Sequence, residues 1–218
     1  MYVYLIFVIS TLFFITDEDK NRDIQGITQQ LSNTILLAGE FTQRRTLQGF
    51  SRVIISTGRF IYWKDNGLYW ETLQPFFHAT TFTPDGSFNW SAPYILETKS
   101  SNESVIQKKI NNILLSIFSA NFESINRSFQ ASWEIDSETW STTLEASDLI
   151  VKKSIKIIKN LEIESSYRKL HFKSSGSDET EIVFSNIKSE KMPDQAQCRY
   201  FHTINSDVCN AYANVSNK

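Results

Sequence analysis

The sequence predicts an α+β protein built on an antiparallel sheet, and three observations lead to this fold class. Short runs rich in aromatic and β-branched residues recur between turn signals along most of the chain. Asp65, Asn66 and Gly67 separate two such runs, and Asn-Gly readily takes the positive φ of a tight hairpin turn. Two further stretches carry apolar residues at helical spacing. We therefore expect a sheet of hairpins covered by two amphipathic helices.

The composition is that of one folded domain. The 218 residues include 16 Phe, 8 Tyr and 5 Trp against only 7 Gly and 4 Pro, which excludes a disordered or low-complexity chain. The net charge of -2 gives no basic surface of the kind that binds nucleic acid. We expect no nucleic-acid partner.

An apolar run from Tyr2 to Ile15 precedes the predicted domain. It is shorter than the roughly 20 residues of a spanning helix and fits the apolar region of a secretory signal peptide. No basic residue precedes the run and no small-residue cleavage site follows it, so an uncleaved anchor or a buried strand remain alternatives. We expect residues 1–16 to be a signal or anchor, 17–187 the folded domain, and 188–218 a C-terminal appendage.

The first half of the domain is predicted as a helix followed by a meander. Ile24, Ile27, Leu31 and Ile35 recur at helical spacing, and Gly39 offers a stop. The strand-like runs that follow span residues 39–48, 51–56, 58–63, 68–73 and 77–83.

The second half repeats this order, with a helix and then strands. Residues 103–119 carry one apolar stripe that includes Ile106, Ile110 and Ile117. The later strand-like runs span residues 129–135, 139–145, 154–158, 161–165, 169–173 and 181–187. Charged and apolar residues alternate in several of them, which predicts a sheet with one face in water. Packed tightly, these parts form an ordinary core; packed loosely, they enclose a cavity. Periodicity alone favours the tight core.

Motifs for catalysis, metal or cofactor binding are absent from the sequence. It has no Gly-rich phosphate loop, His-Glu-x-x-His pair or Gly-x-Ser-x-Gly elbow. His78, His171 and His202 lack metal-ligand spacing. We expect no enzyme activity, no cofactor and no metal. Cys198 and Cys209 are predicted to form a disulfide in an oxidising compartment, with two free thiols as the alternative.

One constellation carries a family resemblance. The segment 58–76, GRFIYWKDNGLYWETLQPF, and the FTQR of 41–44 before it resemble the outer membrane lipoprotein carriers (LolA-like proteins). The spacing from 41–44 to Trp70 and Pro75 fits that family without gaps, and the resemblance covers about residues 24–187. The Lys-Asp-Asn-Gly-Leu-Tyr run looks more like a divergent carrier-like branch than the lipoprotein carrier proper.

This resemblance implies an incomplete antiparallel β-barrel, that is, a strongly curved sheet with helices covering its concave apolar face. Carriers of this kind hold acyl chains on that face, so the match places Phe60, Tyr62, Leu68 and Trp70 in an acyl-chain cavity. The alternative for each of these side chains is ordinary core packing. Family members use a hairpin Arg to latch the lid helices, and Lys64 stands at that position, without the planar fork of a guanidinium.

The function implied by the resemblance is that of a periplasmic carrier. It would bind the acyl chains of a lipoprotein or other hydrophobic cargo as a monomer and move it from an inner-membrane exporter to an outer-membrane acceptor. The alternative is a non-catalytic structural or protein-interaction module whose aromatic face is a filled core or a partner surface.

Overall fold

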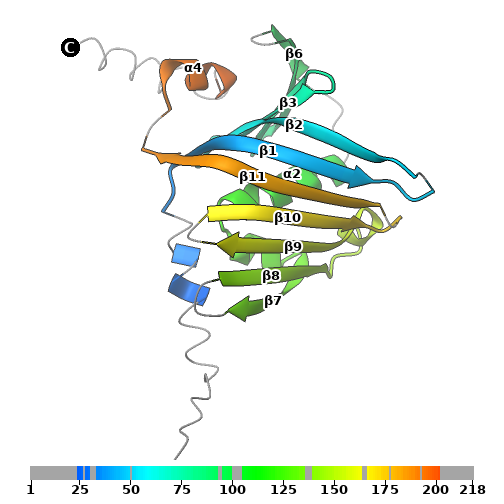
Figure 1. Cartoon of the computed structure of the whole chain (residues 1–218). Helices are drawn as coiled ribbons and strands as arrows, with labels where there is room; N and C mark the ends of the chain where they lie inside the picture. The colour runs from blue at the N-terminus through cyan, green and yellow to red at the C-terminus, as the bar shows by residue number, and fades with distance from the viewer. Residues whose placement is uncertain are drawn as a thin grey trace, which may run out of the picture.

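The computed structural model describes most of the chain as an open antiparallel sheet with a few helices. The described residues are 24–26, 28–29, 33–49, 51–92, 95–99, 105–135, 139–163, 166–176, 178–191 and 193–201. Within them, eleven strands lie in the order β6-β5-β4-β3-β2-β1-β11-β10-β9-β8-β7, so that β6 and β7 are the sheet edges (Figure 1). The predicted signal or anchor, residues 1–16, lies outside the described ranges.

The two halves of the sheet come from the two halves of the chain. The first half comprises β1 (Leu36–Thr46), β2 (Val53–Trp63), β3 (Gly67–Gln74), β4 (His78–Thr83), β5 (Gly86–Ala92) and β6 (Ile95–Lys99). The second half comprises β7 (Phe129–Ile135), β8 (Thr139–Ala146), β9 (Ile155–Ile163), β10 (Ser166–Ser174) and β11 (Glu179–Glu190). The helices are α2 (Val105–Phe118), α3 (Phe122–Asn126) and α4 (Gln195–Cys198), with 3-10 turns η1 (Val151–Lys153) and η2 (Arg199–Phe201). Antiparallel pairing of β1 with β11 joins the halves.

The predicted hairpin at residues 65–67 is confirmed. Strands β2 and β3 pair from Trp63–Gly67 onward, and Asp65 and Gly67 both have positive φ, of 62° and 143°. A Cβ on Gly67 would lie 2.1 Å from the carbonyl oxygen of Phe82 in β4. Glycine is therefore required at this turn both for its backbone angle and for the close approach of the next strand.

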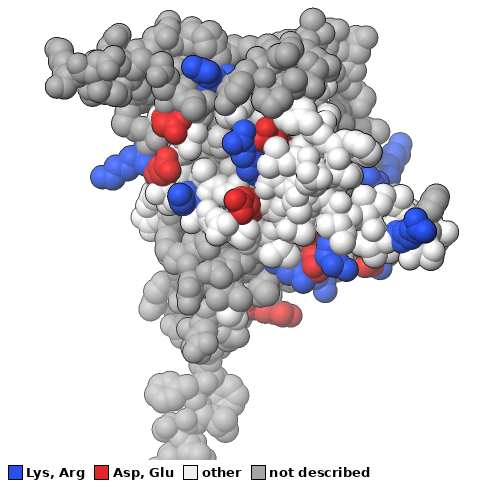
Figure 2. Space-filling model, turned by 45° about the horizontal axis from the view of Figure 1, so that its top comes forward, with Lys and Arg blue, Asp and Glu red and all other residues white. Residues whose placement is uncertain are grey.

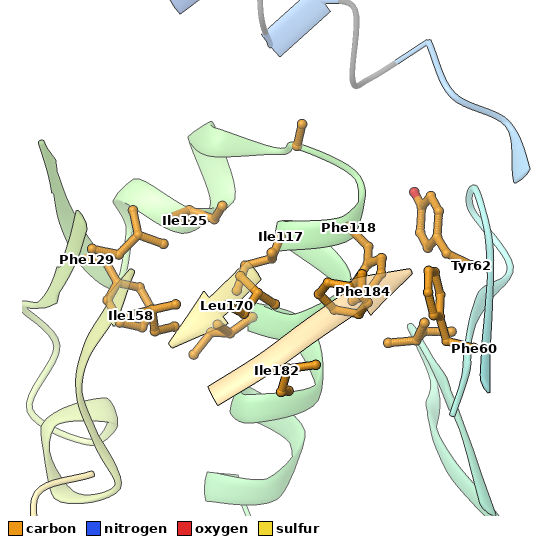
Figure 3. Close-up of a cluster of buried hydrophobic side chains, with 14 of the residues drawn as sticks. Phe60, Tyr62, Ile117, Phe118, Ile125, Phe129, Ile158, Leu170, Ile182 and Phe184 are labelled. Atoms are coloured by element: carbon orange, nitrogen blue, oxygen red, sulfur yellow. The ribbon is translucent and has the colours of Figure 1, made fainter. Parts of the chain in front are cut away.

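Helix α2 packs on one face of the sheet, which we call the inner face, and lies behind β1, β11 and β10 in Figure 1. Its apolar stripe, as predicted, points to the sheet: Ile113, Ile117 and Phe118 are buried. They join an inner cluster drawn from α2, α3 and both halves of the sheet (Figure 3). Its members include Phe41, Phe60, Tyr62, Leu68, Ile125, Phe129, Leu144, Ile158, Leu170, Ile182 and Phe184.

The opposite, outer face of the first half carries a second buried cluster. Side chains alternate between faces along a strand, so the odd-numbered residues of β2 and β3 point away from α2. The C-terminal residues 193–201 pack over them. The outer cluster consists of Leu36, Ile61, Trp63, Tyr69, Ala79, Trp90, Cys198, Tyr200 and Phe201.

The boundary drawn before residue 188 is therefore too early. Strand β11 continues through Lys188 to Glu190, and residues 193–201 form part of the packed domain. The segment looks like a polar appendage in sequence because its buried residues lack the periodicity of a helix or strand. Their partners lie far away along the chain.

The first predicted helix is shorter than expected. Residues 24–26 and 28–29 are helical, but Asn33 already lies in a turn and β1 begins at Leu36. Gly39 lies within β1 and does not end a helix; a Cβ there would meet the Phe60 ring at 2.9 Å. Residues 36–39 extend β1 because their backbone pairs with β2 on one side and β11 on the other, which outweighs local helical spacing.

Several strand predictions merge or were missed. The runs 51–56 and 58–63 form the single strand β2, with Gly58 at a register shift opposite β3. The runs 154–158 and 161–165 largely form β9. Strands β5 and β6 were not predicted. Polar and apolar residues do alternate over Ser87–Ala92 in β5, whereas Ile95–Lys99 in β6 shows no alternation.

Candidate functional site

A cavity of about 360 Å³ lies between α2 and the inner face of the sheet. This volume falls within the usual range for small-molecule sites. Most of its walls are apolar side chains from α2 and from both halves of the sheet. They are Leu68, Trp70, Phe82, Ile113, Leu114, Phe118, Ile155, Leu170, Phe172 and Ile182.

Strand register brings these walls together. Trp70 on β3 pairs with Phe60 on β2, and its ring stacks on Phe41 of β1 with a centroid separation of 3.9 Å. Phe41 pairs with Phe184 on β11. Two residues earlier on that strand, Ile182 pairs with Leu170 on β10. Because residues two apart share a face, these side chains form rows across the middle of the sheet.

The four residues predicted for the cavity all lie on the inner face, but they divide into two pairs. Leu68 and Trp70 line the cavity. Phe60 and Tyr62 are instead 2% and 3% exposed and belong to a packed aromatic group with Phe118 (Figure 3).

This packing of Phe60 and Tyr62 involves both α2 and the second half of the sheet. The Phe60 ring lies 5.6 Å from that of Phe118 and 5.2 Å, edge to face, from that of Phe184. The Tyr62 ring lies 5.8 Å from that of Phe118. Burial raises the pKa of Tyr62 to about 12, and the charge of Asp65 adds to this, whereas a hydrogen bond with the Ser119 side chain acts in the opposite direction. The contacts of Phe60 and Tyr62 are therefore those of core residues, which was the alternative to a place in the cavity wall.

Sequence reasoning missed the cavity walls outside the 58–76 segment. Leu170 and Phe172 alternate with charged residues in β10, so their face could be read from sequence, although their partners could not. Phe82 precedes the β4–β5 turn and shows no comparable signal. On α2, the apolar stripe indicated Ile113 and Leu114 as covering residues but not as cavity walls.

One end of the cavity is polar and open to solvent. Near the tips of the β1–β2 and β10–β11 hairpins it is lined by Gln43, Arg45, Lys173, Ser174, Asp178 and Thr180. The Nη2 atom of Arg45 lies 3.6 Å from Oδ2 of Asp178, and the two side chains are 50% and 31% exposed. The backbone N–H of Gln48 donates a 3.0 Å hydrogen bond to Oδ1 of Asp178. The carboxylate thus ties the two hairpins together.

Lys64, the predicted latch, lies in the β2–β3 hairpin away from this polar end. Its backbone N–H donates to the carbonyl oxygen of Ile35 at 2.8 Å. The residue lines a hollow between the N-terminal helical residues and the turn after α2. The other residues of that hollow include Gln25, Thr28, Gln29, Ser119, Ala120 and Asn121.

On the outer face, directional contacts hold the C-terminal segment. The Tyr200 ring stacks on Tyr69 at 3.8 Å, and Thr81 Oγ1 donates to the Tyr200 carbonyl oxygen at 3.0 Å. Arg59 Nη2 donates to the Tyr200 hydroxyl at 2.9 Å while its Nε contacts the Glu71 carboxylate, which is fully buried. Burial opposes the charge on Arg59, but the hydrogen bond and charge of Glu71 outweigh it, so that the Arg59 pKa is raised.

The disulfide prediction concerns this same segment. Cys198 is buried in the outer cluster and is disulfide-bonded. Cys209, the partner that the sequence predicts, lies outside the described residues.

Other site types find no support in the described part of the chain. No group of three His, Cys, Asp or Glu side chains there could hold a metal ion. Among the same residues, no helix has the length and hydropathy of a membrane span. Basic and acidic side chains are interspersed on the face shown in Figure 2, without a large area of one sign.

Comparison with known proteins yields similarity of fold only. No protein-family model and no curated protein matches the sequence. A LolA superfamily protein from Nitrosomonas europaea is similar with a TM-score of 0.42 and 11% identity, over 80% of this chain and 96% of that chain. A DUF1329 family protein from Desulfovibrio piger is similar with a TM-score of 0.45 and 9% identity, over 84% of this chain and 97% of that chain. A chain of the Pseudomonas aeruginosa MucA/MucB complex gives 0.44 and 9%, over 82% of this chain and 60% of that chain.

The LolA superfamily, which the sequence resembles, is thus also among the proteins of similar structure. At these identities and TM-scores, the likeness carries no argument about function.

Proposed function

We propose that this protein is a non-enzymatic carrier that binds an acylated or otherwise lipid-like cargo in the cavity beneath α2. The observation that carries the proposal is a space of about 360 Å³ with predominantly apolar walls and one polar, exposed end. An acyl chain requires no directional partner and gains about 0.8 kcal/mol for each buried CH₂. Such a cavity therefore suits the tail of an amphiphile, with its polar group at the exposed end.

In this proposal, α2 is the cover of the concave inner face and moves to admit cargo. Its contacts with the sheet are mainly apolar, through Ile113, Ile117 and Phe118. Lys64 would influence the cover, because it borders the same hollow as Ser119 and Asn121 just after the helix ends. A cation near a helix C-terminus is favourable, so an ammonium there could favour the closed position without a bidentate latch.

We further propose that the carrier works in the periplasm, as a monomer, between an inner-membrane exporter and an outer-membrane acceptor. The apolar run from Tyr2 to Ile15 supports export, and the disulfide at Cys198 suits an oxidising compartment. The resemblance of segment 58–76 to lipoprotein carriers supports the direction of transport.

Binding of a fluorescent fatty-acid probe tests the cavity. We expect Trp70→Glu and Leu68→Glu to lower probe affinity at least tenfold, because each places a carboxylate among apolar walls. Leu73→Glu is the matched control, since Leu73 lies on the same strand but is 48% exposed. Thr180→Trp fills the exposed end without adding charge and is also expected to weaken binding. Near-UV circular dichroism identifies folded variants, and unchanged affinity in folded Trp70→Glu and Thr180→Trp proteins would contradict the assignment.

A second candidate is a protein-interaction module, and exposed apolar side chains on several strands favour it. Val53 and Ile55 of β2, Leu73 of β3 and Val183 of β11 are all at least 40% exposed. Lipid extraction and mass spectrometry of the purified protein separate the two candidates. Co-purifying acylated species favour the carrier, whereas their absence together with a lack of probe binding favours the module.

A further inference from the structure

The space available for a ligand is much smaller than the inner face itself. The aromatic group of Phe60, Tyr62, Phe118 and Phe184 fills the region beside the cavity with ring contacts of 5.2 to 5.9 Å. What remains is about 360 Å³. This volume is at the lower end of the range for small-molecule sites, and it suits a single alkyl chain of on the order of 12 carbons.

The cavity also has a direction, which strand register defines. At its buried end, Leu68 of β3 pairs with Tyr62 of β2, and both side chains are almost fully buried. At its other end, Arg45 of β1 pairs with Thr180 of β11. Arg45 lies eight residues further along β1 than Leu37, which pairs with Tyr62. A single tail entering between these ends would leave its head beside Arg45.

Arg45 is suited to bind an anionic head. Its side chain is half exposed and its 3.6 Å approach to Asp178 is longer than a hydrogen bond. Asp178 in turn is held by the backbone of Gln48. A guanidinium presents several donors in a planar fork, so Arg45 can keep this loose contact while donating to a carboxylate or phosphate of the ligand.

We infer that the cargo site accepts one acyl chain of about 12 carbons, with a carboxylate or phosphate head bound by Arg45, and excludes cargo with two or three chains. This inference rests on the proposed carrier function and names its ligand class. It also identifies Arg45 and the Thr180 end of the cavity as a head-group site.

Chain length and chain number are tested by displacing the fatty-acid probe with alkyl carboxylates of 8 to 18 carbons. Affinity should rise about fourfold for each added CH₂, as expected for its burial, and stop rising near 12 carbons. A two-chain phosphatidic acid should displace the probe far less well than a single-chain alkyl phosphate. Affinity that keeps rising to 18 carbons, or equal displacement by the two-chain lipid, would overturn the inference.

Head-group binding is tested with dodecanoate, dodecyl phosphate, dodecanol and inorganic phosphate. Both anionic amphiphiles should bind about tenfold more tightly than dodecanol, in keeping with a charged hydrogen bond. Inorganic phosphate should not displace the probe, and displacement by it would assign Arg45 to a free anion instead of a lipid.

Two variants complete this test. Arg45→Gln should reduce the tenfold preference for the anionic amphiphiles over dodecanol to about threefold or less. Arg44→Gln is the matched control, because Arg44 is the adjacent residue on the opposite face of β1 and is also exposed. A preference that survives Arg45→Gln, or that Arg44→Gln removes equally, would contradict the head-group assignment.

The outcomes separate this inference from the carrier function. If no alkyl ligand displaces the probe or binds, the proposed function itself fails. If multi-chain lipids bind as well as single-chain ones, the carrier function stands and the inference fails.

Discussion

The two faces of the first half-sheet are covered in different ways. On the inner face, α2 contacts β2 and β3 through apolar side chains and leaves a cavity beside them. On the outer face, the C-terminal segment is held by a stacked aromatic ring and by hydrogen bonds from Arg59 and Thr81. Apolar contacts are non-directional and tolerate sliding, whereas directional contacts fix one arrangement. The same two strands thus carry non-directional apolar contacts on one face and directional polar and stacking contacts on the other.

The strongest test of the fixed cover is Phe201→Ala. Phe201 is fully buried and meets Trp63 edge to face at 5.5 Å. Loss of a buried ring should lower the free energy of unfolding by about 3–5 kcal/mol, measured by urea denaturation. Phe76→Ala is the control, because Phe76 is 80% exposed and should change stability by less than about 0.5 kcal/mol. Similar small effects for both would show that the segment is a loose appendage after all.

The next test removes the polar anchor of the same cover. Arg59→Met leaves the buried Glu71 carboxylate without its cation and should cost about 2 kcal/mol, less than a fully buried pair because Arg59 is half exposed. Adding Glu71→Gln should recover part of the loss, since it removes the unpaired charge. A double-mutant cycle by denaturation measures the coupling. If the two substitutions were simply additive, the pair would not anchor the segment.

A smaller effect is expected where α2 borders the cavity. Leu114→Ala only enlarges an existing space and should lower stability by about 1 kcal/mol, whereas Ile117→Ala removes a buried side chain of the same helix and should cost about 2–5 kcal/mol. Thermal and urea unfolding of both variants provide the comparison. Equal losses would indicate that side chains fill the cavity in solution.

The smallest effect concerns the exposed ion pair of Lys173 on β10 with Glu179 on β11. The hydrogen bond from Lys173 lowers the pKa of Glu179, and the charges of Lys173 and His171 add to this. A lowered carboxylate pKa stabilises the fold above the ordinary value of 4.5 and loses this effect as pH falls through the lowered value. Lys173→Met should therefore raise the Glu179 pKa toward 4.5, measured by NMR titration, with little change in Tm at pH 7. Lys188→Met, an exposed change on β11, should leave that pKa in place.

Much of the sheet could be predicted because its signals are local. The hairpin at residues 65–67 depends on turn chemistry, and the shared face of Leu68 and Trp70 depends only on the two-residue period of a strand. The covers depend on contacts that no local pattern encodes. Phe60 and Tyr62 became core residues because Phe118 and Phe184 reach them from other parts of the chain.

The C-terminal cover shows the same limit more clearly. Tyr200 and Phe201 lie in a short polar segment without periodicity, and their partners Tyr69 and Trp63 are on the first hairpin. The position of Arg45 at the end of the cavity likewise follows from the pairing of β1 with β11. Neither contact can be read from composition or spacing.

The pairing of β1 with β11 also affects the order of folding. Within the described strands, the six of the first half and the five of the second half each form a local meander. The two meanders pair only through β1 and β11, from Leu36 and Glu190 to Thr46 and Glu179. Local hairpins close quickly, whereas pairing across most of the chain pays a large loop-closure entropy first. The cavity is lined from both halves of the sheet, so it is complete only after β11, the last strand, has paired with β1.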